Sequence, residues 1–546
     1  MPSTPTADLL LTDLTVYTND ATRSRGREIA VKDGRILAVG QEAGELSNLR
    51  GPATEVLSLP GRLAVPGFQD AHVHAPFAGR NRLRVWLNDL HGRADYLEAI
   101  AAYASANPDE PWVVGGGWAM ECFPGGLPRK EDLDAIVPDR PVFLFNKDVH
   151  GAWVNSVALE RAGITKDTPD PSDGRIERDA ETGEPTGMLH EGAAYTFNDT
   201  LVPVPGRAEW EAAILNGQEH LHGLGITAWQ DAWVTPGTHE AYRSLAESGG
   251  LTARVTGALW WDRHQGLDQI PQFQEQRESG VVGNFHATSV KIMTDGVLEN
   301  YTGALLEPYC DGCGGHTDNH GLSYVEPDLL GAAVTELDRL GFQVHMHAIG
   351  DRAVRNALDA VGAARTANGM SDQRHHIAHI QIVQPDDIPR FAELGVIANC
   401  QPLWAQSDPQ MEELTVPFLG RERVELMYPF GSLLRSGAQL AGGSDWSVTS
   451  ANPLEEIDVM VNRRDHLTPD APAFLPEERV SLEVALAAFT SGTAHVNHDA
   501  DAGRLEPGMR ADLAVLDRDI FALPEGTIAD ASVDLTVASG SVVFRR

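Results

Sequence analysis

Cysteine is scarce in this chain of 546 residues, which contains only Cys122, Cys310, Cys313 and Cys400. Four cysteines are too few for a disulfide scaffold in a chain of this size, which favours a reducing compartment. We therefore expect a cytoplasmic protein. Signals for export and membrane insertion are also lacking. Residues 1–8 have no basic region followed by an apolar core, as a signal peptide would, and no apolar run is long enough to span a bilayer.

Positive charge is in short supply as well. The chain carries 42 lysines and arginines against 78 aspartates and glutamates, which gives a formal net charge of −36. Such a surface repels phosphate backbones and anionic lipids, so we expect no nucleic-acid partner and no membrane partner. Lysine itself is rare, and Lys291 is the only lysine in the second half of the chain.

Short strand-like segments, separated by Gly, Pro and Asp, occupy both ends of the chain. Near the N-terminus, residues 28–31 and 35–39 flank the turn Lys32-Asp33-Gly34, which is typical of a hairpin. Chain ends often lie close together in folded proteins. We therefore expect residues 1–65 and 501–546 to build one β-sandwich domain.

The middle of the chain, residues 66–500, alternates strand-like and helix-like segments, which favours an α/β architecture. The spacing of the strands predicts a (β/α)₈ barrel of the TIM type. Residues 76–208, rich in Gly and Pro turns, are expected to form an insertion packed over the site. The expected barrel strands are residues 68–74, 226–230, 253–261, 287–293, 343–348, 375–382, 396–401 and 440–445.

The insertion is also rich in aromatic side chains. They have two interpretations: they line a substrate pocket, or they form the core of the insertion itself, and the second is favoured for most of them. These residues are Trp112, Trp118, Phe123, Phe143, Phe145 and Trp153.

Metal-binding side chains stand at the ends of the expected barrel strands, where barrels of this kind place their active sites. The segment Pro-Gly-Phe-Gln-Asp-Ala-His-Val-His at residues 66–74 puts His72 and His74 on one face of a strand. Two neutral imidazoles so placed can bind a metal ion, although two hydrogen-bonded histidines at a strand end would give the same pattern. Later strand ends add Lys291, His345, His347, His375, His376, His379 and Asp445.

The order His-x-His, Lys, His, His, Asp resembles the amidohydrolase superfamily. The motifs Pro-Gly-Phe-x-Asp-x-His-x-His, Val-Lys-Ile-x-x-Asp-Gly, His-Ala-Ile-Gly-Asp-Arg-Ala and Gly-Ser-Asp are similar to amidohydrolase family 3, the YtcJ-like branch. The resemblance covers nearly the whole chain, including Gly-Met-Arg-Ala-Asp-Leu at residues 508–513. The run Asp-Gly-Val-Leu-Glu-Asn at residues 295–300 is similar to N-substituted formamide deformylases.

This resemblance implies a centre of one or two divalent ions, zinc in the first place. Lys291 would react with carbon dioxide and bridge the two ions as a carbamate, because a free ammonium group has no lone pair. Asp445 would bind the first ion and accept the proton of the attacking water, so the catalytic residues are Asp445 and Lys291. The implied metal ligands are His72 and His74 for the first ion, His347 and His379 for the second, and Lys291 and Asp445.

The neighbouring histidines are assigned by their position on the strands. His347, rather than His345, lies nearer the C-terminal end of its strand and occupies the position expected from the family. Strand alternation predicts that His375 shares a face with His379 and that His376 points the other way. We therefore expect His345, His375 and His376 to have core or supporting roles.

The ligand set suggests a mechanism. Two divalent ions about 3.5–4 Å apart share a water molecule and lower its pKa towards neutrality, and Asp445 then passes the proton to the leaving nitrogen. We predict a metal-dependent hydrolase that cleaves a C–N bond in an amide, an N-acyl amine or an N-formyl amine, acts on a small molecule and assembles as a homodimer. The alternatives are a one-metal centre, an ester hydrolase or another reaction on the same centre, and a non-catalytic binding protein.

Cys310 and Cys313, followed by His316 and His320, form a second candidate site. A Cys-x₂-Cys pair with two nearby histidines is typical of a structural zinc site, and the two thiols are also spaced for a disulfide. The spacing is tighter than in a zinc finger. A Gly-rich loop near the rim of the active site is therefore the favoured interpretation.

Overall fold

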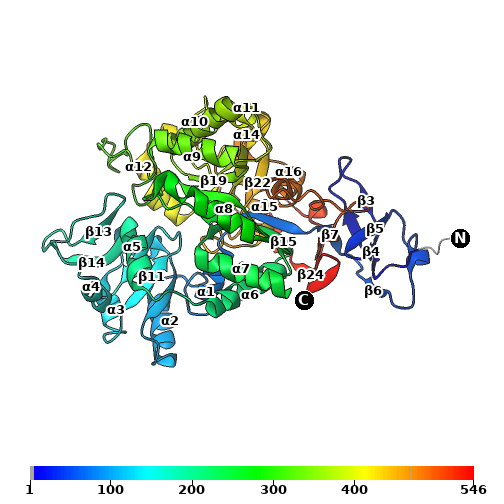
Figure 1. The fold of residues 1–546 in the computed structure, drawn as a ribbon, viewed down its shortest axis with the longest axis horizontal. Helices are drawn as coiled ribbons and strands as arrows, with labels where there is room; N and C mark the ends of the chain where they lie inside the picture. Colours follow the sequence, from blue (N-terminus) through cyan, green and yellow to red (C-terminus); the bar gives the residue numbers. More distant parts are fainter. Residues whose placement is uncertain (1–4, 469, 525) are drawn as a thin grey trace.

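The computed structural model describes residues 5–468, 470–524 and 526–546. At the centre of these residues lies a nearly closed barrel of eight parallel strands (Figure 1), which confirms the predicted fold class. The strands follow one another around the barrel in sequence order. They are β8 (Phe68–Val73), β15 (Ile226–Val234), β16 (Arg254–Trp260), β18 (Phe285–Met293), β19 (Gln343–Ala348), β20 (His376–His379), β21 (Ile397–Cys400) and β22 (Leu440–Gly442).

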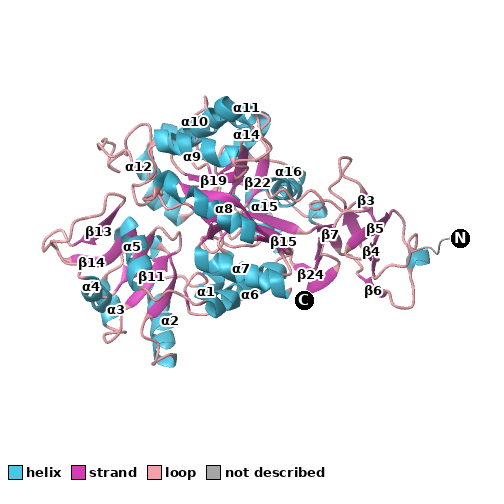
Figure 2. Cartoon of the chain, in the orientation of Figure 1, coloured by secondary structure: helices cyan, strands magenta, loops and turns pink. Residues whose placement is uncertain are grey.

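Helices cover the outside of the barrel (Figure 2). In α9, buried side chains recur every three or four residues, at Leu330, Ala333, Val334 and Leu337, so one face of the helix packs against the strands. The covering helices are α6 (Arg207–Gly223), α7 (Pro236–Ser248), α8 (Ile270–Ser279), α9 (Pro327–Arg339), α10 (Asp351–Asn368), α11 (Ile388–Leu394), α14 (Phe430–Arg435), α15 (Pro453–Asn462) and α16 (Leu482–Ala487).

The barrel closes between its first and last strands, just beyond their C-terminal ends. The backbone N–H of Asp445 donates to the carbonyl oxygen of His72 at 2.7 Å, and the N–H of His74 donates to the carbonyl of Trp446 at 2.8 Å. Gly443 makes this approach feasible, because a Cβ atom there would lie 2.8 Å from the backbone nitrogen of His72. The backbone that closes the barrel therefore also carries candidate ligands.

The chain ends form two sheets that pack against each other, one from the N-terminal end alone and one from both ends. The hairpin predicted at Asp33 and Gly34 is present, with φ of 48° and 74° at these residues. Strand β7 (Leu63–Pro66) pairs antiparallel with β23 (Leu513–Leu516), so the two chain ends share one sheet. One sheet has the order β5 (Arg35–Gly40), β4 (Glu28–Lys32), β1 (Leu9–Thr12), β6 (Glu55–Ser58), and the other β25 (Ser541–Arg545), β24 (Val533–Ala538), β23, β7, β2 (Thr15–Tyr17), β3 (Arg25–Gly26).

The insertion is built on a separate six-stranded sheet within the described residues, flanked by helices α2 (Arg93–Ala106), α3 (Lys130–Asp134), α4 (Ser156–Ala162) and α5 (Gly192–Leu201). All six aromatic residues singled out in the sequence lie in its two hydrophobic clusters, and none lines the cavity described below. The core interpretation therefore holds for them. The sheet order is β13 (Gly174–Arg178), β14 (Pro185–Glu191), β12 (Gly151–Val154), β11 (Val142–Asn146), β10 (Val113–Trp118), β9 (Val85–Trp86).

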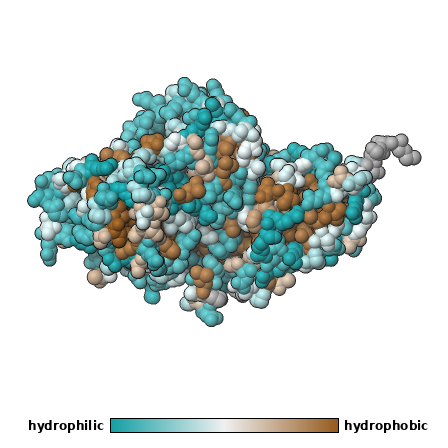
Figure 3. Space-filling view, turned by 90° about the horizontal axis from the view of Figure 1, so that it is seen from below, coloured by the Kyte–Doolittle hydropathy of each residue, from teal (hydrophilic) through white to brown (hydrophobic). Residues whose placement is uncertain are grey.

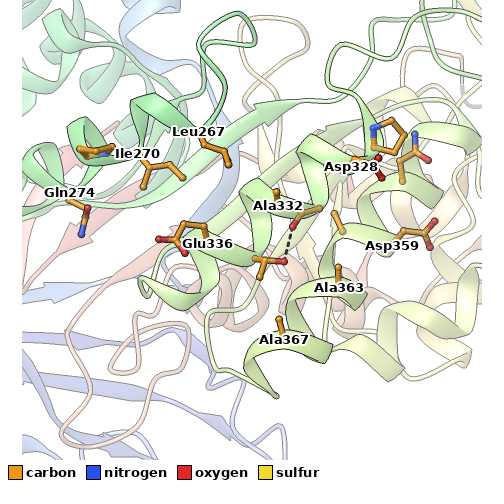
Figure 4. A pocket seen from close by; sticks show the side chains of 15 residues that line it. Leu267, Ile270, Gln274, Asp328, Ala332, Glu336, Asp359, Ala363 and Ala367 are labelled. Atoms are coloured by element: carbon orange, nitrogen blue, oxygen red, sulfur yellow. Dashed lines mark hydrogen bonds between the residues drawn. The ribbon is translucent and has the colours of Figure 1, made fainter.

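The surface seen in Figure 3 is mostly hydrophilic, with apolar patches over the insertion on the left and over the terminal β-strands on the right. A wide hollow of about 1070 Å³ lies outside the barrel, where residues of α8, α9 and α10 meet (Figure 4). It contains none of the predicted metal ligands. Within the described residues, no helix combines the length and the apolar character needed to cross a membrane.

Candidate metal centre

All six predicted ligands line one narrow cavity of about 40 Å³ at the C-terminal mouth of the barrel. They come from the ends of β8, β18, β19 and β20 and from the residues that follow β22, which is where parallel strands deliver their last side chains. The six residues are His72, His74, Lys291, His347, His379 and Asp445.

One group of three forms the tightest part of this site. In the described part of the chain, His72, His74 and Asp445 are the one group of three or more His, Cys, Asp or Glu residues whose ligand atoms all lie within 4.8 Å of one another. Asp445 Oδ1 is 3.3 Å from His72 Nε2 and 2.9 Å from His74 Nε2. Lys291 Nζ lies 3.5 Å from His72 Nε2, so the lysine reaches the same group.

His347 and His379 form a second group, with ring centroids 4.6 Å apart. Asp295 Oδ1 lies 3.0 Å from His347 Nδ1, which places the ring proton there and leaves the lone pair on Nε2. Both His347 Nε2 and His379 Nδ1 are buried without a hydrogen-bond partner among the described residues. Because buried polar atoms are nearly always satisfied, these two orphaned ring nitrogens fit a site that binds metal ions.

The electrostatics of the cavity suit metal binding. Burial lowers the pKa of His72, His347 and His379 well below the usual value, so these imidazoles are neutral and carry lone pairs. Burial also lowers the pKa of Lys291, to about 7. Burial alone would raise the pKa of Asp445, but the hydrogen bond and charge of His74 outweigh it, so the carboxyl group is ionised well into acid pH.

The predicted alternation around His379 is wrong. His375 faces outwards, with its Nε2 atom 2.9 Å from Asp338 Oδ1 on α9. The ring of His376 packs instead against that of His345, with the two ring centroids 4.0 Å apart. His379 nevertheless reaches the cavity because its φ is +76°, a left-handed conformation that turns the side chain off the regular strand pattern. Such strained backbone is common at functional sites.

The three remaining histidines lie around the cavity or outside the barrel rather than lining it. His345 Nε2 is 2.8 Å from His72 Nδ1, so it orients a candidate ligand. Asn399 Nδ2 donates to His376 Nδ1 at 3.1 Å, and the backbone N–H of Val344 donates to His375 Nδ1 at 3.0 Å. Supporting and core roles for these three histidines stay a prediction.

Sequence reasoning missed most of the cavity wall. Trp404 stacks on His379, with ring centroids 4.9 Å apart and an angle of 15° between the rings. Trp233 and Trp260 stand at the C-terminal ends of β15 and β16, where an examination of all strand ends, rather than of metal ligands alone, would have found them. Tyr195 comes from the insertion and carries no comparable signal.

The insertion also contributes an ion pair. His150 lines the cavity, and its Nδ1 atom lies 2.9 Å from Oε2 of Glu191, which is completely buried. Burial alone would lower the pKa of His150, but Glu191 raises it to about 9. Burial alone would raise the pKa of Glu191, but His150 holds it at about 2.

Cys310 and Cys313 behave as ordinary loop residues. Both thiols are free, and within the described residues neither belongs to a group of metal-binding side chains. Cys310 Sγ instead lies 3.6 Å from Nη2 of Arg423. The loop interpretation favoured from the sequence agrees with this arrangement.

A parallel barrel that gathers histidines and an aspartate at its C-terminal mouth has an arrangement that can bind metal ions. A sequence profile of the amidohydrolase family matches residues 55–544, and the chain belongs to that family, as the motifs predicted.

Individual proteins agree with this assignment. The chain is 29% identical over 541 residues to the putative amidohydrolase YtcJ of Bacillus subtilis (strain 168), covering 97% of this chain and 98% of the relative. It is 27% identical over 556 residues to the N-substituted formamide deformylase of Arthrobacter pascens, covering 99% and 98%. The crystal structure of an uncharacterized metal-dependent hydrolase from Pyrococcus horikoshii OT3 superimposes with a TM-score of 0.74 at 26% identity, covering 95% of this chain and 99% of that one.

Proposed function

We propose that this protein is a metal-dependent hydrolase that cleaves a C–N bond in a small molecule: an amide, an N-acyl amine or an N-formyl amine. One observation carries the proposal. Six candidate ligands from distant parts of the chain line one cavity, and the ring atoms His347 Nε2 and His379 Nδ1 have no hydrogen-bond partner within the described residues.

Zinc is the metal that this donor set favours, since imidazole nitrogen and carboxylate oxygen are its usual ligands. We propose that His72, His74 and Asp445 hold one ion and that His347 and His379 hold a second. Lys291 would complete the ligand set as a carbamate, because a buried lysine with a pKa of about 7 is partly neutral and can react with carbon dioxide.

Bound ions of this kind lower the pKa of water and polarise a carbonyl group. The protein supplies the proton transfer: Asp445, ionised at neutral pH, accepts a proton from the attacking water and delivers it to the leaving nitrogen. Asp295 and His345 keep the rings of His347 and His72 in the orientation that leaves their free nitrogens facing the cavity.

The cavity wall supports an uncharged substrate. Its side chains other than the candidate ligands are mainly aromatic or aliphatic, with Asp148 and His150 as the ionisable ones. None of the described lining residues is an arginine that would pair with a substrate carboxylate. The relative that is named as an N-substituted formamide deformylase supports an N-formyl or N-acyl amine as the substrate. Ester hydrolysis on the same centre remains the second candidate reaction, because the same activated water attacks esters.

Metal analysis combined with a substrate screen tests this proposal. His74→Ala, Lys291→Ala and Asp445→Ala are expected to lose bound metal and at least 100-fold in kcat/KM on amides and formamides, as removal of a ligand destroys the centre. His316→Ala, in an exposed loop, should match the wild type in both measurements. A purified wild-type protein that binds no divalent metal, or that turns over fully in the presence of a chelator, would overturn the proposal.

Several further expectations belong with this proposal. The free thiols support a reducing compartment, and the cytoplasm is the proposed location. A homodimer is the proposed assembly, and sedimentation of the purified protein tests it. The proposed domain boundaries are residues 1–65, 66–500 with the insertion at 76–208, and 501–546.

A further inference from the structure

The loop that joins β11 and β12 brings one histidine of the insertion beside the metal centre. His150 is 6% exposed, lines the cavity, and has its ring centroid 5.5 Å from that of His347. The loop bends sharply to do this: Val149 has a φ of +65°, a conformation that a β-branched residue adopts only when its surroundings impose it. The insertion therefore holds His150 in place against a local conformational cost.

Hydrogen bonds fix this histidine from several sides. Glu191 Oε2 lies 2.9 Å from Nδ1 of His150, and Glu191 Oε1 accepts a hydrogen bond from Thr302 Oγ1 at 2.6 Å. The carbonyl oxygen of His150 accepts from the N–H of Glu191 at 2.9 Å and from Nδ2 of Asn300 at 3.1 Å. Glu191 also has a left-handed backbone, with a φ of +52°.

One atom of His150 is left without a structural role. With Nδ1 engaged by Glu191, no hydrogen bond within the described residues involves Nε2, while the ring lines the cavity. Glu191 is completely buried and acts as an acceptor at both oxygens, and a buried carboxylate requires a positive partner. Among the described residues, His150 is the basic side chain within hydrogen-bond distance of this carboxylate. An imidazolium there, protonated at both ring nitrogens, balances the buried charge and presents Nε2–H to the cavity as a donor.

We propose that His150 is a further catalytic residue, whose Nε2–H donates a hydrogen bond to the carbonyl oxygen of the scissile amide, and that Glu191 is its positioning residue. This inference rests on the hydrolase function proposed above. It assigns to the insertion a direct part in the reaction, in addition to covering the barrel mouth.

The contribution of His150 follows from the movement of charge. When hydroxide adds to the carbonyl carbon, a C–O bond forms and the π electron pair of the C=O bond moves to the oxygen. A donor already fixed beside that oxygen stabilises the charge without reorganising. The pair returns to re-form C=O as the C–N bond breaks, and the amine leaves with the proton carried by Asp445. His150 keeps its own proton throughout.

The experiment compares His150→Ala, His150→Gln and Glu191→Gln with the wild type on one amide substrate found in the screen. We expect His150→Ala to lower kcat by about 10²–10³-fold, the usual effect of removing one such donor, with KM changed by less than about threefold. His150→Gln retains an N–H donor and should recover part of this loss. The kcat of Glu191→Gln should lie between those of His150→Ala and the wild type.

Two readouts do not depend on turnover. Metal content should stay at the wild-type level in all three variants. Calorimetric titration with a methylphosphonamidate, whose anionic oxygen mimics the tetrahedral adduct, should show a loss of affinity that parallels the loss in kcat. His264→Gln, an exposed histidine with 66% of its side chain accessible, is the matched control and should be unchanged in every measurement.

Three results would overturn this inference: wild-type kcat in His150→Ala, a loss confined to KM, or a loss of metal that accounts for the lost activity. Failure of the hydrolase proposal is distinguishable from these, because the wild-type protein would then lack turnover on every amide before any variant is compared.

Discussion

Asp295 offers the most informative test of how this site is built. Its buried carboxylate accepts four hydrogen bonds. Oδ1 receives them from Nδ1 of His347 at 3.0 Å and from the N–H of Ile349 at 3.1 Å, and Oδ2 receives them from the N–H groups of Gly350 and Ala304, both at 2.9 Å. One carboxylate thus anchors the ends of two strands and the orientation of one candidate ligand.

The substitution Asp295→Asn leaves one acceptor oxygen for four donors. Hydrogen bonds to a charged group contribute about 1.5–3 kcal/mol each, so losing two should lower the free energy of unfolding of the metal-free protein by about 3–6 kcal/mol. If the new amide oxygen faces Gly350 and Ala304, the new NH₂ group faces His347, and Nδ1 of His347 must then accept a hydrogen bond. The ring proton then moves to Nε2, which should weaken metal binding about 10–100-fold.

Urea unfolding of the metal-free protein measures the first effect, and metal content after dialysis against graded chelator measures the second. Asp338→Asn is a matched control, because Asp338 Oδ1 lies 2.9 Å from His375 Nε2 on the outside of the barrel. Asp338→Asn should lower the free energy of unfolding but leave metal affinity unchanged. Wild-type metal affinity in Asp295→Asn, or equal loss in both variants, would refute the assignment of Asp295 as the residue that orients His347.

Two further predictions concern stability. Burial alone would raise the pKa of Asp338, but hydrogen bonds from His375 and other neighbours outweigh it and hold the pKa below its usual value. The stabilisation by this carboxylate is therefore present above about pH 4 and is lost as the pH falls further. In urea unfolding, the difference in free energy of unfolding between wild type and Asp338→Asn should shrink from pH 7 to about pH 3. A difference that grows on acidification would contradict this. Gly443→Ala should lower the free energy of unfolding by about 1–3 kcal/mol and reduce metal content, because its Cβ would lie 2.8 Å from the backbone nitrogen of His72. In Gly331→Ala the new Cβ would have no atom within 4 Å, so this control should keep wild-type stability and metal content. Calorimetry and metal analysis measure the two effects.

The sequence alone determined the barrel strands, the terminal hairpin and the six candidate ligands. The strands and the hairpin depend on short-range rules, since side chains alternate along a strand and a parallel barrel brings the ends of its strands together. His72 and His74 lie side by side for that reason. The six ligands were selected by the resemblance to the family motifs, which also selected His347 over His345. In the structure His347 lines the cavity, and His345 lies against His72.

The tertiary structure alone decided the rest of the site. His379 enters the cavity through a left-handed backbone, which strand alternation does not predict because the surrounding contacts impose it. His150 and Glu191, separated by 41 positions in the sequence, meet because two strands of the insertion pair in one register. Local patterns cannot specify such meetings, since they depend on how distant segments pack, whereas His72 and His74 needed only the period of a β-strand.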